Sequence, residues 1–187
     1  MKRPGTRRPV AAITTIVGVI VAFLFAIFVT SPKGQRAESS FTPLLGKPAP
    51  TAEGATLDGP TFSLSSRRGS WVALNFFSST CTPCRNEHPA LAAFVDSQAA
   101  LPVERRTELA TVVFSDSVTN VREFFAKEGG GWPVLLDKDG RAVFAFGVTK
   151  VPETWIIDPA GVVRKRLITQ VTAVGLQAEL DTLRAAT

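Results

Sequence analysis

The sequence predicts an α/β domain with a mixed central sheet flanked by helices, preceded by an N-terminal transmembrane helix. Three observations support this prediction. After residue 70, short apolar runs alternate with segments of helical periodicity. The last two apolar runs are separated only by a turn, as in a β-hairpin. Residues 10–30 carry no charge, and as a helix they would extend ~32 Å, which is enough to cross a bilayer.

The N-terminal segment is expected to anchor the chain in the cell membrane. Residues 1–9 contain four basic side chains and should form a cytoplasmic tail, because positive charge stays on the cytoplasmic side. Residues 10–30 then form a single-pass signal anchor in the lipid bilayer, and everything after Ser31 is extracytoplasmic. A cleaved secretory signal is the alternative, but its apolar region is usually about 7 to 15 residues long and ends at an A-x-A-like site. No such site precedes Pro32. Both interpretations export the folded domain.

Residues 31–40, SPKGQRAESS, are polar and lack an apolar period, so we expect a flexible linker there. The folded domain should span residues 41–187. The strand expected at 71–77 is apolar almost throughout, which is typical of a strand buried on both faces. The other expected strands are 110–114, 134–136, 154–157 and 162–168, and the expected helices are 83–100, 118–127, 142–146 and 173–183.

The chain has a net charge of +5, but the excess lies at its N-terminus. Residues 1–38 carry six basic side chains and one acidic side chain, whereas residues 39–187 carry 15 of each sign. The folded domain is therefore neutral overall, and its sequence shows no basic patch with interleaved aromatic residues. This distribution excludes nucleic acid as the main partner.

Only two cysteines occur, Cys81 and Cys84, and two residues separate them. They cannot build a disulfide-rich scaffold, and with the single histidine they leave a structural zinc site short of four ligands. The pair follows the strand 71–77 and opens the helix 83–100. Because thiol-disulfide exchange needs two thiols within reach of each other, this placement favours a redox-active pair over buried structural or metal-binding cysteines.

The positions of the two cysteines predict different roles. Cys81 stands at the helix start, where unpaired backbone N–H groups and the positive end of the helix dipole stabilise a thiolate. We therefore expect Cys81 to be the nucleophile. Cys84 lies one turn into the helix, so it should be less exposed and act as the resolving thiol. Pro83 lies in the first helical turn, where a missing N–H costs no hydrogen bond.

Three motifs, together with the membrane anchor, resemble the TlpA/ResA/CcmG (DsbE) group of membrane-anchored thioredoxin-like proteins. The motifs are NFFSSTCTPCRNEHPAL at 75–91, VPETWIID at 151–158 and GKPAP at 46–50. The resemblance implies a thioredoxin fold, thiol-disulfide oxidoreductase activity, and no cofactor beyond a redox-active Cys81–Cys84 disulfide. It also implies reduction of disulfides in exported proteins such as apocytochrome c, with electrons from a CcdA/DsbD-like membrane thiol-electron donor.

The same resemblance points to residues around the dithiol. Pro152 corresponds to a cis-proline that faces the dithiol, and the backbone of its neighbour Val151 can pair with an incoming peptide like an added strand. Glu87 matches a glutamate close to the dithiol, where a carboxylate opposes thiolate formation and can shuttle a proton. Glu153 would form an acidic wall of the substrate groove. Thr80 stands where this group usually has Trp, so it changes the rim that contacts substrate and leaves substrate identity open.

Three other functions are compatible with the sequence. A disulfide-forming oxidase would use the same residues, since the direction of exchange depends on reduction potential. A metallochaperone would bind copper or zinc through Cys81, Cys84 and His88, although a surface or helix-packing histidine is the simpler interpretation. A membrane-tethered binding domain would need no redox chemistry and would tolerate Cys84→Ser. Asn75, inside the first strand, is expected to be a buried polar side chain with a hydrogen-bond partner.

Overall fold

The computed structural model describes residues 13, 16–23 and 38–186. The chain divides into two units, residues 1–34 and 35–187. In the first unit, residues 16–23 are helical and exposed. None of the helices in the described ranges combines the length and the apolar character that a membrane crossing requires. The rest of the predicted span 10–30 lies outside the described residues.

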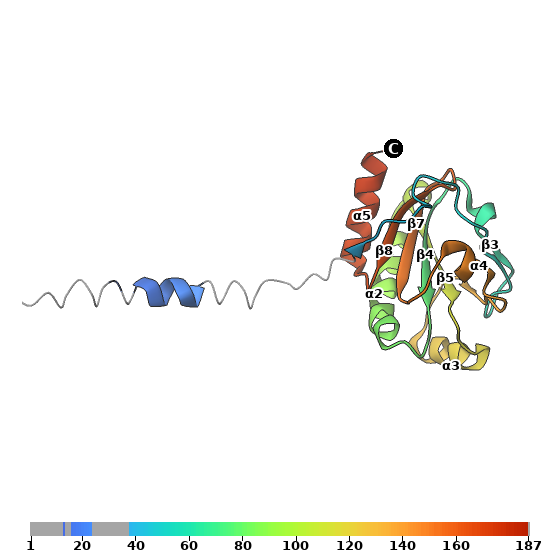
Figure 1. The fold of residues 1–187 in the computed structure, drawn as a ribbon, viewed down its shortest axis with the longest axis horizontal. Coiled ribbons are helices and arrows are strands. Elements are labelled where there is room, and N and C mark those ends of the chain that lie inside the picture. Colours follow the sequence, from blue (N-terminus) through green and yellow to red (C-terminus); the bar gives the residue numbers. More distant parts are fainter. Residues whose placement is uncertain (1–12, 14–15, 24–37, 187) are drawn as a thin grey trace, which may run out of the picture. The chain divides into compact units, whose positions relative to one another are not determined.

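The second unit is built on a six-stranded sheet with the strand order β1-β8-β7-β4-β5-β6 (Figure 1). Strands β4, β5 and β6 are parallel, whereas β7 runs antiparallel to β4 and to β8, and β1 runs antiparallel to β8. The predicted mixed sheet is thus confirmed. The strands are β1 (Glu38–Ser39), β4 (Trp71–Phe77), β5 (Thr107–Val113), β6 (Val134–Leu135), β7 (Glu153–Ile157) and β8 (Val163–Ile168); β2 (Glu53–Gly54) and β3 (Phe62–Ser63) form a separate pair.

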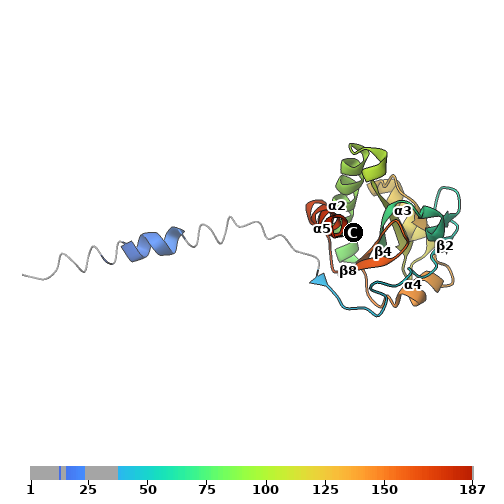
Figure 2. The same cartoon turned by 90° about the horizontal axis from the view of Figure 1, so that it is seen from above.

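Helices cover both faces of the sheet. Figures 1 and 2 show α2 (Thr82–Ala99) and α5 (Ala173–Ala185) side by side. Side chains of α3 (Val118–Glu128) join the same apolar cluster as α2 and α5, while α4 (Arg141–Phe146) belongs to a second cluster. Two short 3-10 helices, η1 (Leu64–Arg67) and η2 (Val103–Arg105), complete the elements.

Strand β4 is buried along all seven residues, because both faces of the sheet are covered. Its side chains alternate between the two apolar clusters, as the strand period requires. Ala73 and Phe77 pack with residues of α2, α3 and α5, whereas Leu74 and Phe76 pack with α4 and the segment that precedes β4. The double core fixes the end of β4 and thereby the starting point of the loop that leads into α2.

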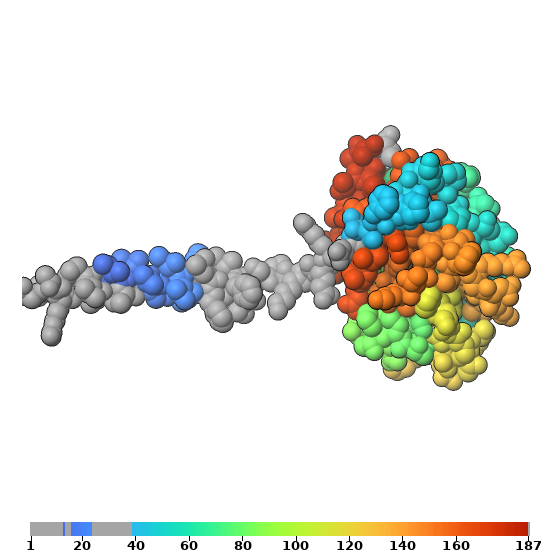
Figure 3. All heavy atoms as spheres, in the orientation of Figure 1, coloured from blue at the N-terminus to red at the C-terminus, as the bar shows by residue number. Residues whose placement is uncertain are grey.

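The folded region begins earlier than the sequence predicts. Residues 38–40 belong to the expected linker, but they pair with β8 along the edge of the sheet. Figure 3 shows the residues that follow β1 on the surface beside the C-terminal strands. Strands of two residues have no periodicity of their own, so only their partner reveals them. The sequence misses β2 and β3 for the same reason. Strand β5 starts at Thr107, before the predicted start at residue 110. The sequence misses this start because Thr107 and Glu108 are polar and interrupt the apolar run.

Candidate active site

The two cysteines lie at the junction of β4 and α2 and are joined by a disulfide bond. Cys81 is the N-cap of α2, with extended backbone, and its Sγ accepts the Cys84 N–H at 3.2 Å. Cys81 is partly exposed, whereas Cys84 is completely buried against the core. The structure therefore has the asymmetry that we expect of an attacking and a resolving sulfur. Pro83 lies in the first turn of α2, as predicted.

The loop before β7 faces the dithiol. The peptide bond between Val151 and Pro152 is cis, which confirms the expectation drawn from the family resemblance. The Val151 carbonyl oxygen lies 3.5 Å from Cys81 Sγ, although the two residues are 70 positions apart in the sequence. Val151 thus brings a backbone acceptor directly to the more exposed of the two sulfurs.

Glu87 is buried one turn beyond Cys84, with 2% of its surface exposed. Its Oε1 accepts the Val171 N–H at 2.6 Å and its Oε2 accepts the Asn75 side-chain amide at 3.1 Å. Burial raises the pKa of Glu87 to about 7, and these two hydrogen bonds only partly oppose that effect. Glu87 can therefore gain or lose a proton near neutral pH. Asn75 also donates to Thr154 Oγ1, so its expected role as a bonded, buried polar group is confirmed.

Glu153 follows the cis-proline, but it is not an open acidic wall. It is 2% exposed, and Arg166 of β8 binds both of its carboxylate oxygens at 2.7 and 2.9 Å. The Arg166 guanidinium also lies 5.3 Å from the centre of the Trp155 ring. Sequence patterns did not identify Arg166, because only the antiparallel pairing of β7 and β8 brings it beside Glu153.

A groove of about 720 Å³ runs beside the cis-proline loop. It brings together three of the predicted substrate-contacting residues, Val151, Pro152 and Glu153, with Pro83 from the active-site turn. Its remaining lining residues are Ser40, Thr149, Lys150, Arg166, Ile168, Thr169 and Gln170. Thr80 is exposed and lies outside this groove, in a smaller pocket of about 290 Å³ with Arg85 and residues of α3. The structure therefore separates Thr80 from the other predicted contacts.

Asp116 holds the loop that leads to Cys81, a role that sequence analysis missed. Its Oδ2 accepts the Ser79 N–H at 2.6 Å, the Ser79 hydroxyl at 2.6 Å and the Ser78 hydroxyl at 3.1 Å. Partial burial opposes ionisation, but hydrogen bonds from Ser79, Ser117 and Ser78 outweigh it and lower the pKa of Asp116. A signal existed: Asp116 follows β5, and the carboxyl ends of the parallel strands β4 and β5 meet at one edge of the sheet.

His88 is placed as a packing residue. It is 3% exposed, its ring contacts Phe124, Phe125 and Trp132, and its Nε2 lies 3.0 Å from the Gly129 carbonyl oxygen. Burial lowers the pKa of His88, although backbone hydrogen bonding partly opposes this. Across residues 13, 16–23 and 38–186, no three His, Cys, Asp or Glu side chains are grouped so that they could hold a metal ion.

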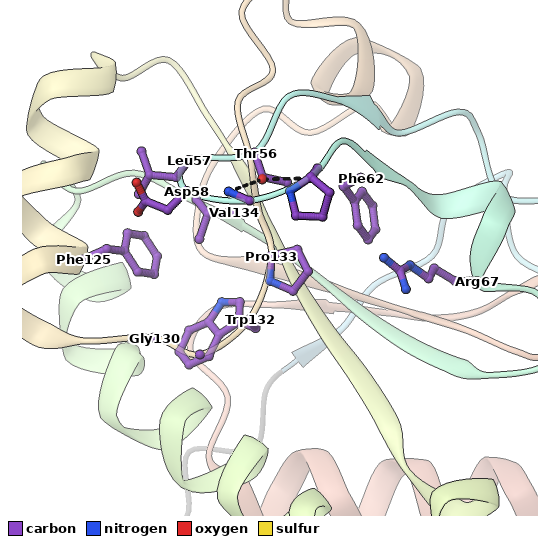
Figure 4. Close-up of a pocket in the computed structure, with 13 residues that line it drawn as sticks. Thr56, Leu57, Asp58, Phe62, Arg67, Phe125, Gly130, Trp132, Pro133 and Val134 are labelled. Atoms are coloured by element: carbon purple, nitrogen blue, oxygen red, sulfur yellow. Dashed lines mark hydrogen bonds between the residues drawn. The ribbon is translucent and has the colours of Figure 1, made fainter.

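A second cavity, of about 310 Å³, is lined by residues near β3, η1 and the start of β6. Figure 4 shows Phe62, Arg67, Trp132 and Pro133 around it. The Thr56 hydroxyl accepts the Gly59 N–H and donates to the Pro60 carbonyl oxygen, so it serves its own turn. None of the predicted site residues lines this cavity. Three of them line the larger groove, and one of these, Val151, lies next to Cys81 Sγ, so we place the chemistry at the larger groove.

Thiol-disulfide exchange is the chemistry that the dithiol supports, and the mixed sheet with its cis-proline loop is that of the thioredoxin-like class. The chain belongs to the AhpC/TSA family, whose model matches residues 45–166. It is 26% identical to the thiol-disulfide oxidoreductase ResA of Geobacillus thermodenitrificans over 140 residues. The aligned region covers 75% of this chain and 78% of that protein.

Two further similarities agree with this assignment. The chain is also 28% identical to the thiol:disulfide interchange protein HelX of Rhodobacter capsulatus over 173 residues, and the aligned region covers 91% of each protein. A crystal structure of a thioredoxin-family thiol:disulfide interchange protein from Chlorobium tepidum matches with a TM-score of 0.62 and 24% identity, over 76% of this chain and 98% of that one. The structural likeness shows the fold. Together with the sequence relatives, it establishes a thiol-disulfide oxidoreductase of the ResA/CcmG type.

Proposed function

We propose that this protein is a membrane-anchored, extracytoplasmic disulfide reductase that acts on exported proteins such as apocytochrome c. The observation that carries the proposal is the asymmetry of the dithiol. Cys81 is partly exposed next to Val151, which lines the groove, while Cys84 is fully buried. A protein substrate can therefore reach only the Cys81 sulfur. Similarity to the thiol-disulfide oxidoreductase ResA and to the thiol:disulfide interchange protein HelX supports thiol-disulfide exchange at this site.

The charges around the dithiol favour reduction of the substrate over oxidation. Burial raises the pKa of Glu87 to about 7, so a substantial fraction of this carboxyl is ionised at neutral pH. Hydrogen bonds outweigh partial burial and lower the pKa of Asp116, so a second negative charge lies against Ser78 and Ser79 in the loop before Cys81. Negative charge opposes formation of thiolates. Because a stabilised reduced form is what makes a strong oxidant, the opposite bias favours a reducing dithiol.

The reaction proceeds in two exchanges. The Cys81 thiolate attacks one sulfur of the substrate disulfide, the substrate S–S bond breaks, and the released substrate sulfur takes up a proton. Cys84 then loses its proton, with Glu87 as the nearby carboxyl that can accept it, and attacks Cys81 Sγ. The Cys81–Cys84 bond forms, the second substrate sulfur leaves with the electron pair and is protonated, and the enzyme is left oxidised. A CcdA/DsbD-like membrane thiol-electron donor must then reduce it again.

The membrane anchor is proposed for residues 10–30, with residues 1–9 in the cytoplasm. The uncharged 21-residue stretch and the basic residues before it support this orientation. The described part, residues 16–23, is helical, and the apolar side chains of Ile16, Val17 and Phe23 are more than half exposed. Tethering would raise the effective concentration of the dithiol near a membrane donor.

The reduction potential of the full-length chain in detergent tests the proposed direction. The protein is equilibrated in glutathione or dithiothreitol buffers, and the fraction of Cys81–Cys84 disulfide is measured by thiol alkylation and mass spectrometry. A value of roughly −200 to −270 mV supports a reductase, whereas a value near about −120 mV identifies a disulfide-forming oxidase and rejects the reductase. Cys84→Ser should trap a mixed disulfide with the substrate. If Cys84→Ser keeps full activity in a disulfide-reduction assay, the mechanism with two thiols is wrong.

The buried, ring-packed position of His88 argues against a metallochaperone that uses Cys81, Cys84 and His88. Stoichiometric copper or zinc binding to the reduced chain that disappears in His88→Ala would overturn this conclusion. Membrane location is tested by alkaline extraction of membranes followed by protease treatment from the extracytoplasmic side. The anchor predicts that the chain stays with the membrane and that residues 38–187 are exposed to the protease.

A further inference from the structure

The loop between β8 and α5 is tied to the active-site helix by two hydrogen bonds. Gln170 Nε2 donates to the Pro83 carbonyl oxygen at 2.7 Å, and the Val171 N–H donates to Glu87 Oε1 at 2.6 Å. Thr169, directly before them, has a φ of 70°, a left-handed conformation that residues other than glycine rarely adopt. Such a conformation persists only where surrounding contacts enforce it. The chain therefore bends sharply at Thr169 and brings Gln170 to the turn between the cysteines.

The acceptor of the Gln170 hydrogen bond has a special place in that turn. Pro83 is the residue directly before Cys84, so its carbonyl group belongs to the peptide unit that leads into the resolving cysteine. Fixing this carbonyl fixes the orientation of that peptide unit. Gln170 also lines the groove together with Pro83 and the cis-proline loop. One side chain thus contacts both the turn that carries Cys84 and the groove beside Cys81.

We propose that Gln170 is a positioning residue for the second exchange, in which Cys84 resolves the mixed disulfide. In that step a bond forms between the sulfurs of Cys84 and Cys81, the bond between Cys81 Sγ and the substrate sulfur breaks, and the substrate sulfur leaves with the electron pair and takes up a proton. While Cys81 is bonded to substrate, the Cys81–Cys84 bond is open and no longer closes the turn. The Gln170 hydrogen bond holds the turn in the closed geometry during this interval, so that Cys84 stays within reach of Cys81.

The inference rests on dithiol exchange itself and not on the proposed direction of electron flow, because an oxidase runs through the same mixed disulfide in reverse. It also differs from a role in the first exchange. Attack by Cys81 needs only its own sulfur and the substrate, and Gln170 makes no hydrogen bond to Cys81. Loss of the Gln170 donor should therefore slow resolution and leave attack unchanged.

The test uses the full-length, pre-reduced chain in detergent and an aromatic disulfide, dithiobis(nitrobenzoate), that releases a coloured thiolate at each step. In stopped flow, attack gives a first phase whose rate rises with probe concentration, and resolution gives a second phase whose rate does not. Gln170→Met keeps the chain length but removes the donor. We expect an unchanged first phase and a second phase slowed about fivefold to tenfold, which corresponds to about 1 to 1.4 kcal/mol.

Two controls make the test specific. Gln177→Met removes a comparable amide on α5, which bonds to Gln98 and Asp181 instead, and both phases should be unchanged. Cys84→Ser should show the first phase alone, which assigns the second phase to resolution. If Gln170→Met does not fold, Gln170→Glu replaces it, because a carboxylate of the same length cannot donate. A second phase within twofold of the wild-type rate, or equal slowing of both phases, would overturn the proposal.

Discussion

Glu87 is the residue at which folding and chemistry are most closely coupled. It lies in the core behind the dithiol and receives the Val171 N–H and the Asn75 amide. Desolvation disfavours its charged form, so the protein must either bury a neutral acid or bear the cost of a buried charge. The same property makes Glu87 suited to exchange a proton with Cys84 near neutral pH.

Glu87→Gln should therefore change the pH dependence of stability. The pKa of Glu87 is about 7 in the folded protein, whereas the ordinary pKa of a glutamate is 4.5, so the folded state binds more protons than the unfolded state between these pH values. Wild-type stability consequently falls as pH rises from 4.5 to 7, by about 3 kcal/mol from this group, and the cost persists at higher pH. Glutamine carries no charge and escapes this cost. Urea unfolding at acidic and alkaline pH should show that the free energy of unfolding of Glu87→Gln increases relative to that of the wild type as pH rises.

The outcome has a matched control in Glu104→Gln, which removes an exposed carboxyl from η2. Its stability difference from the wild type should not vary by more than a few tenths of a kcal/mol over the same pH range. Parallel pH profiles for Glu87→Gln and the wild type would show that Glu87 titrates normally in the folded protein.

Asp116→Asn should weaken the loop that carries Cys81. Asp116 Oδ2 accepts three hydrogen bonds from Ser78 and Ser79, and Oδ1 accepts the Ser117 N–H. An asparagine has only one side-chain oxygen, so it cannot accept both sets of hydrogen bonds. Hydrogen bonds outweigh partial burial and hold the pKa of Asp116 below 3.8, so its stabilising effect is present above that pH and is lost as pH falls through the folded value. We expect a lower urea midpoint than wild type at pH 7 and a smaller difference at pH 3. Asp96→Asn, on the exposed side of α2, should show neither effect.

At the scale of the elements, the ends of helices place the functional groups. α2 begins at Cys81, whose sulfur caps the helix by accepting the Cys84 N–H. α3 begins next to Asp116, where Ser117 is the N-cap and its hydroxyl accepts the Asn120 N–H at 3.1 Å. α5 begins just after the loop that carries Gln170. Three helix starts therefore converge on the edge of the sheet at which β4 ends.

Ser117→Ala should destabilise α3 without disturbing the dithiol. Removal of an N-cap side chain costs about 1 kcal/mol, because the Asn120 N–H loses its acceptor. The backbone N–H of Ser117, which donates to Asp116 Oδ1, is retained in the variant. Urea denaturation should show the loss, while the rate of probe reduction stays at the wild-type value. A slower rate of probe reduction in Ser117→Ala than in the wild type would mean that the Ser117 cap also positions the Cys81 loop.

At the scale of the whole molecule, the oxidation state of the dithiol is coupled to the stability of the fold. A dithiol that reduces substrates is one whose disulfide form is favoured by the folded protein, whereas a strong oxidant stabilises its reduced form. The disulfide closes a short loop at the junction of β4 and α2, between the central strand and the helix that packs on it.

The oxidised chain should therefore unfold at a higher urea concentration than the reduced chain. Both forms are measured in the same detergent, the reduced form with excess dithiothreitol and the oxidised form without it. Cys84→Ser serves as the control, since it cannot form the bond and its midpoint should be the same in both buffers. A more stable reduced form would agree with an oxidase and would contradict the reductase.

Several features of this protein follow from the sequence alone. The apolar run of β4, the cysteine pair after it and the helical period that follows predict the strand, the dithiol and α2, because these signals are local and strong. The asymmetric burial of Cys81 and Cys84 follows from their positions at a helix start. The cis-proline was predicted from the resemblance of the VPET motif, and the structure contains it.

Other features depend on contacts between distant parts of the chain. Strand β1 pairs with β8, Arg166 binds Glu153, Asp116 holds Ser79 and Gln170 reaches Pro83 only because the sheet order brings these segments together. No periodicity marks such residues, since each is polar and its partner is 13 to 130 positions away. The sequence thus determined the reacting sulfurs and their fold class. The tertiary structure decided which polar groups hold them, because hydrogen-bond partners are chosen by proximity in space and not by position along the chain.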